Sequence, residues 1–72
     1  MKECRINIQN DIVEKILEAL KTCSQGIGVT LQYEYTIEKD RYGSTIIFIP
    51  KEGRKMNPTD FFFLGYFVGR DY

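Results

Sequence analysis

The chain has 72 residues, of which ten are basic and ten are acidic, so its formal net charge at pH 7 is zero. Seventy-two residues make one domain at most, and a balanced charge argues against partners bound mainly by electrostatics, such as duplex DNA or an anionic membrane. With only two cysteines and no histidine, the chain is not a disulfide-rich secreted scaffold. Because so short a chain buries only a small core, self-association is the support that we expect.

Targeting signals and cofactor motifs are not found in the sequence. No apolar stretch follows residues 1–5, so we expect no signal peptide, a cytoplasmic location and reduced thiols. The longest apolar segment, residues 61–68, is too short to cross a bilayer, and we expect no membrane partner. Gly26-Ile27-Gly28 precedes an expected strand, whereas a phosphate-binding glycine loop must be followed by the N-terminus of a helix. We therefore expect no cofactor.

The N-terminal segment, residues 4–9, alternates apolar and polar side chains, which is the period of a half-buried strand. One alternative stays open, because Ile8 also continues the helical spacing of the next segment, which runs through Ile12, Ile16 and Leu20.

Residues 11–23 carry the clearest helical pattern. Their apolar side chains fall within about 140° at 100° per residue; they are Ile12, Val13, Ile16, Leu17, Leu20 and Cys23. Charged residues occupy the opposite side. We expect Asn10 or Asp11 to cap the first turn, and Gly26 to close the helix in the left-handed conformation.

Two strands are expected next. Residues 27–38 alternate strictly, which predicts a long amphipathic strand with Tyr33 and Tyr35 on its apolar side. Residues 39–43 turn the chain. Residues 44–49 are apolar on both faces, as in a central strand that is covered on both sides, here by helices or by a partner chain.

The last helix is expected to follow the polar loop 50–56, with Asn57 as its cap and Pro58 at its first position. Its body, residues 61–69, is apolar almost all round, and such a helix is buried all round. A monomer this small cannot enclose it, so we expect a self-association surface, most simply in a twofold homodimer. The expected contacts are Phe62, Phe63, Gly65, Tyr66, Phe67 and Gly69.

Together these segments predict a single α+β domain, residues 1–72, of order β-α-β-β-α. Its sheet is three-stranded and mainly antiparallel, with strand 44–49 in the middle and two helices covering it. The first helix makes the right-handed crossover between strands.

Catalytic chemistry is not indicated. Nucleophilic catalysis needs a base, the chain has no histidine, and Cys4 and Cys23 fall on apolar faces as small core residues. Glu34, Glu38 and Asp40 lie close together, but they fit a solvated strand face and turn, and they lack the spacing of a metal site. We expect neither an enzyme nor a metal protein.

The leading functional hypothesis is a non-enzymatic interaction or regulatory module that acts as a homo-oligomer through its aromatic C-terminal helix, with another protein as a further possible partner. The first alternative is a module for single-stranded nucleic acid, which combines stacking and positive charge. Its residues would be Arg41 and Tyr42 in the turn and Lys51, Arg54 and Lys55 in the loop. The second alternative is a small-ligand binder with an aromatic pocket between subunits.

Overall fold

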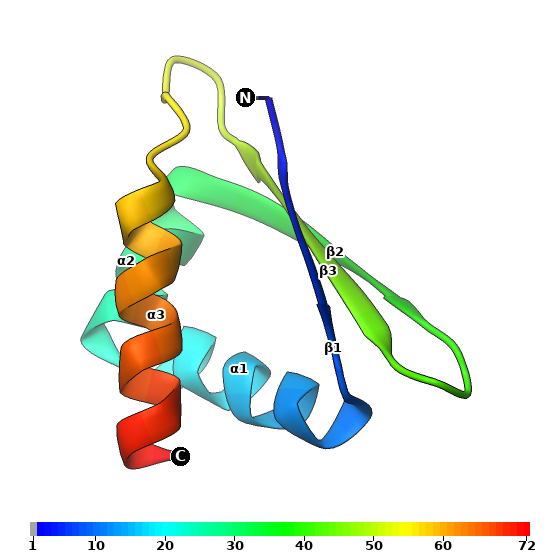
Figure 1. Cartoon of the computed structure of the whole chain (residues 1–72). Helices are drawn as coiled ribbons and strands as arrows, with labels where there is room; N and C mark the ends of the chain where they lie inside the picture. Colours follow the sequence, from blue (N-terminus) through cyan, green and yellow to red (C-terminus); the bar gives the residue numbers. More distant parts are fainter. Residues whose placement is uncertain (1) are drawn as a thin grey trace.

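A computed structural model describes residues 2–72 as three strands and three helices. In chain order they are β1 (Cys4–Ile8), α1 (Asn10–Thr22), α2 (Ser24–Gln32), β2 (Tyr33–Lys39), β3 (Ser44–Pro50) and α3 (Pro58–Asp71). The strands form one antiparallel sheet of order β1-β3-β2, which confirms the α+β fold with β3 in the middle. The helices lie together on one side of this sheet (Figure 1).

The register of the sheet settles the N-terminal segment as a strand. Cys4 lies opposite Phe48 and Ile6 lies opposite Ile46. Both residues of β1 pack against the core between sheet and helices. Ile8 therefore ends a strand and does not begin the first helix.

Helix α1 buries Val13, Ile16 and Leu20 of the expected side, together with Ala19, while Ile12 is exposed. Its expected caps are wrong. The N-cap residue is Gln9, without a side-chain cap bond. The amide of Asn10 instead reaches the turn between β2 and β3, where its Nδ2 donates to the Asp40 carbonyl at 3.3 Å and its Oδ1 accepts from the Ser44 hydroxyl. These bonds fasten the start of α1 to the sheet.

Residues 24–32 form helix α2, so the strand expected over 27–38 is wrong for its first half, and three helices cover the sheet instead of two. The structure also contradicts the left-handed role of Gly26, which lies within α2. A Cβ on Gly26 would lie 2.1 Å from the Ala19 carbonyl oxygen. The glycine thus allows the α2 backbone to pack directly on α1, and this contact overrides the alternating pattern.

The second half of the expected strand is confirmed as β2. Tyr33, Tyr35 and Ile37 share the side that faces the core, and Tyr35 lies opposite Phe48 in the register. Helices cover β3 on this side alone (Figure 1). On its other side Ile47 is buried between its register neighbours Arg5 and Thr36, while Ile49 is exposed.

Helix α3 begins as expected, because the Asn57 Oδ1 accepts from the Thr59 N–H at 3.1 Å and Pro58 lies in the first turn. Leu64 and Val68 are its buried residues. The Phe61 ring completes the contact with the sheet, 4.8 Å from the Phe48 ring between centroids. The core therefore lies between the sheet and one side of α3.

Candidate functional site: the exposed side of helix α3

The side of α3 turned away from the core carries three large aromatic rings in water. Phe62 is 72% exposed, Tyr66 is 54% exposed and Phe63 is 44% exposed. Soluble monomers rarely leave large apolar patches uncovered, and such patches commonly mark interaction surfaces. This is the clearest candidate site among residues 2–72, and it includes residues expected from the sequence.

Two glycines complete this surface. Gly65 and Gly69 are exposed, and a Cβ on either would meet no atom within 4 Å. Packing inside the monomer therefore does not require glycine at these positions, unlike at Gly26. Phe62, Gly65, Tyr66 and Gly69 follow the i, i+3, i+4, i+7 spacing of one helix face. We call these four residues the α3 stripe.

Phe67, the remaining expected contact, lies at the margin of this surface. It is half-buried, and the Arg70 guanidinium carbon lies 5.0 Å from its ring centroid and 5.4 Å from that of Tyr66. Arg70 also forms a two-point ion pair with Asp71, at 2.9 and 3.0 Å. This hydrogen-bonded guanidinium lowers the pKa of Asp71. A charged pair thus borders the aromatic surface near the end of α3.

Helix α2 exposes two further apolar side chains, although the alternating pattern of the sequence predicts that both are buried. Ile27 and Leu31 are both exposed, whereas Gly26 and Val29 are buried. The expected strand put Ile27 and Leu31 on a buried face. Their separation of four residues is a helical signal, but it competes with the alternation of the same segment.

The basic residues of the nucleic-acid alternative do not form one cluster. Arg41 and Tyr42 lie in the turn before β3, whereas Lys51, Arg54 and Lys55 follow its other end. Figure 1 shows the turn and the loop at opposite ends of the β2–β3 hairpin. The structure therefore separates the Tyr42 ring, which is 86% exposed and would stack on a base, from the cations of the loop.

The basic loop has a pocket of its own at the end of β3. Arg54, Lys55 and Lys2 line it together with the apolar residues Ile49 and Met56. Pro50 and Pro58 complete the lining, which contains no aromatic ring. Within the part of the chain that the structure describes, no acidic side chain pairs with these three cations.

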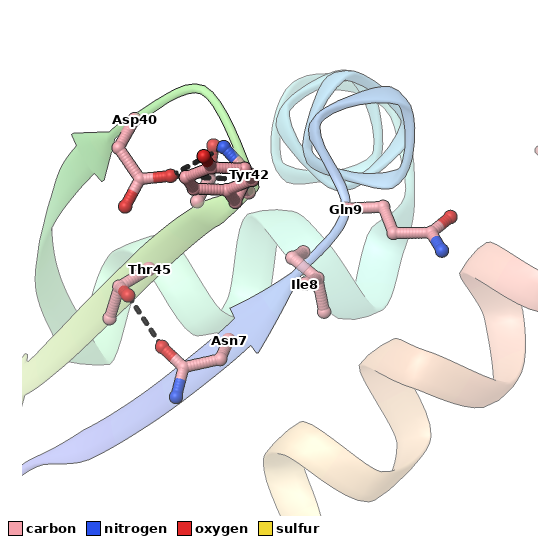
Figure 2. Close-up of a pocket in the computed structure, with 8 residues that line it drawn as sticks. Asn7, Ile8, Gln9, Asp40, Tyr42 and Thr45 are labelled. Atoms are coloured by element: carbon pink, nitrogen blue, oxygen red, sulfur yellow. Dashed lines mark hydrogen bonds between the residues drawn. The ribbon is translucent and has the colours of Figure 1, made fainter.

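A second pocket lies beside the β2–β3 turn (Figure 2). Several of its polar groups bond to one another. The Asp40 carboxylate accepts from the backbone N–H groups of Tyr42 and Gly43, at 2.7 and 3.0 Å, and the Thr45 hydroxyl donates to Asn7. No second carboxylate lines this pocket, so its arrangement is that of a bonded turn and does not supply an acid–base pair.

Residues with nucleophilic or metal-binding chemistry are not grouped in the described structure. Burial raises the pKa of the Cys4 thiol, which disfavours its thiolate. Residues 2–72 contain no group of three His, Cys, Asp or Glu side chains placed to hold a metal ion. Across the same residues, no buried side-chain nitrogen or oxygen lacks a hydrogen-bond partner.

Comparisons with known proteins add no family to this description: no family model, curated protein or solved structure matches the chain. Among the helices of residues 2–72, none combines the length and apolar character needed to cross a membrane.

Proposed function

We propose that this protein is a non-enzymatic interaction module that associates with itself through the exposed side of α3. The observation that carries the proposal is the exposure of Phe62, Phe63 and Tyr66 on a single helix. Full burial of one such ring contributes roughly 1.5–3 kcal/mol. Covering three partly exposed rings in each of two subunits therefore provides several kcal/mol, which is comparable to the stability of a small domain, about 5–15 kcal/mol.

Sedimentation velocity over a range of micromolar concentrations tests this proposal. We expect the wild-type chain to shift from an 8.4 kDa species toward a dimer as its concentration rises. Phe62→Ser and Tyr66→Ser should weaken this shift, because each removes a ring from the surface without touching the buried core. Tyr42→Ser is the matched control: its ring is the most exposed one, but it lies in the distant turn.

A monomer at every concentration would contradict self-association. Equal weakening by Tyr42→Ser would show that exposed rings cause a general stickiness, and that the surface of α3 has no particular role.

The pocket of Lys2, Arg54 and Lys55 supports a second candidate function, the binding of single-stranded nucleic acid. Its lining combines three cations with apolar residues, although it contains none of the aromatic rings that usually stack on the bases in such sites. Fluorescence anisotropy with a labelled oligothymidylate at low salt tests this candidate. Binding should weaken with added salt and with Arg54→Glu, and an oligonucleotide that stays free at low salt would rule it out.

A further inference from the structure

We infer that two copies of α3 pack antiparallel, with Phe62 of one subunit over Gly69 of the partner subunit and Tyr66 over Gly65 of the partner subunit. This inference rests on the proposed function and specifies the geometry of the same surface. It makes the α3 stripe complementary to itself, with two rings that project and two glycines that leave room.

The spacing of the α3 stripe supplies the first argument. At 3.6 residues per turn its four members lie within about 100° of one another around the helix, and all four are exposed. A twofold axis that passes between residues 65 and 66 reverses one helix against the other. It brings position 62 level with position 69 of the partner and position 66 level with position 65. Every ring then faces a glycine, in both directions.

The parallel arrangement lacks this match. It places Phe62 against its own copy and Tyr66 against its own copy, while the glycines face glycines. Each ring pair would then hold the two helices apart, and gaps would remain at the glycine positions. Such gaps are contrary to the close packing of protein interfaces. Parallel helices also align their macrodipoles side by side, whereas antiparallel helices place opposite partial charges together.

The exposed area indicates a second copy of this chain as the occupant. An aromatic residue buries about 200 Å², so the exposed fractions of Phe62, Phe63 and Tyr66 in two subunits supply roughly 700 Å². Specific interfaces begin near 1,200 Å² in total. The rings thus provide more than half of a small dimer interface, and the flanking surface of α3 must provide the remainder. A different protein could supply its own complementary shape, so binding it would not require α3 to carry both the rings and the glycines that leave room for them.

Disulfide cross-linking tests the orientation. Single cysteines are introduced as Phe62→Cys and Gly69→Cys in a chain that also carries Cys4→Ala and Cys23→Ala, with folding checked by circular dichroism. In the antiparallel pair the two copies of position 62 are about 10 Å apart along the axis, beyond the Cα separation of about 7 Å that a disulfide spans. We expect efficient cross-links per dimer, with the dimer fraction measured by sedimentation, when the two variants are mixed, and few per dimer from Phe62→Cys alone, whose lost rings also weaken pairing.

Two glycine variants provide an independent measurement in which all the aromatic rings of the surface are kept. Gly65→Ala and Gly69→Ala should each stabilise the monomer toward urea, because alanine favours the helix and the added Cβ meets no atom within 4 Å. They should also raise the dimer dissociation constant tenfold or more, because the Cβ occupies the space of the partner's ring. Gly28→Ala in α2, which is equally free of close contacts, should leave that constant unchanged.

The outcomes separate this inference from the proposed function. A dimer in which Phe62→Cys cross-links to itself as readily as in the mixture, or in which Gly65→Ala and Gly69→Ala associate like the wild type, overturns the antiparallel pairing and leaves self-association standing. A wild-type chain that stays monomeric overturns both.

Discussion

Tyr33 is the residue that joins the sheet, the basic loop and the start of α3. Its side chain is 1% exposed, and its hydroxyl accepts from the Asn57 N–H at 2.9 Å and donates to the Asp60 carboxylate at 2.8 Å. Its ring also packs 4.9 Å from the Phe61 ring between centroids. One buried oxygen therefore holds the residues that position α3.

Removal of this oxygen gives the first prediction. Tyr33→Phe keeps the ring but leaves the Asn57 N–H and the Asp60 carboxylate without this partner, so we expect the free energy of unfolding to fall by about 1–3 kcal/mol. Urea denaturation followed by circular dichroism measures the change. Tyr35→Phe is the control, since no hydrogen bond of its hydroxyl is found within residues 2–72. Equal losses for the two variants would contradict a special role for the Tyr33 hydroxyl.

The same hydroxyl predicts how stability depends on alkaline pH. Burial, the larger cause, and the hydrogen bond to Asp60 raise the pKa of Tyr33 above its ordinary value of 10.0, although the bond from Asn57 lowers it. The folded chain therefore favours neutral Tyr33. Its contribution to stability is complete below pH 10 and is lost as the pH rises through the higher folded pKa. Urea midpoints of the wild type should thus fall more steeply above pH 10 than those of Tyr33→Phe, and parallel curves would refute this linkage.

At the scale of elements, periodicity and capping predict most of the fold. Alternation locates β1 and the second half of β2, a two-sided apolar run locates β3, and Asn57-Pro58 marks the start of α3. Helix α2 could not be predicted in this way, because its local pattern alternates like a strand. The contact that decides its conformation joins Gly26 to the backbone of Ala19, and no pattern within the segment reveals a contact of that kind.

The candidate site could be predicted only in part for a related reason. An all-round apolar helix indicates excess hydrophobic surface, and Phe62, Phe63 and Tyr66 are indeed exposed. Which of the α3 rings enters the core depends on how the helix packs against the sheet. In the structure this ring is Phe61, which lies against Phe48 of β3. Likewise, charge alone suggests one group of cations from the turn 39–43 and the loop 50–56, whereas the length of β3 keeps the two segments apart.

The packing of α2 on α1 leads to a prediction for two glycines of the same helix. Gly26→Ala should destabilise the chain, because its Cβ would lie 2.1 Å from one backbone atom of Ala19 and 2.6 Å from another, so that α2 must move. Gly28→Ala meets no atom within 4 Å, and it should raise stability by about 0.5–1 kcal/mol through helix propensity alone. Urea denaturation compares the two, and equal stabilisation would contradict the close approach of α2 to α1.

The whole molecule is built on one side of its sheet. All three helices share that side (Figure 1), and α3 contributes Leu64 and Val68 to the core while its far side stays exposed. Helix α3 therefore has two apolar surfaces, and the single subunit buries only one of them. The small size of the core and the exposed rings therefore have the same cause, since residues 2–72 supply no further element that covers the outer side of α3.

This architecture couples folding to association. If folded subunits pair through α3 and unfolded chains do not, pairing stabilises the folded state by an amount that grows with the logarithm of protein concentration relative to the dissociation constant. The urea midpoint of the wild type should therefore rise with total protein, by about 1.4 kcal/mol of unfolding free energy per dimer, or about 0.7 kcal/mol per subunit, for each tenfold increase above that constant. Phe62→Ser should show a nearly constant midpoint over the same range, whereas Tyr42→Ser should follow the wild type. A wild-type midpoint independent of concentration would mean that the exposed side of α3 contributes nothing to stability, and that each subunit folds on its own core alone.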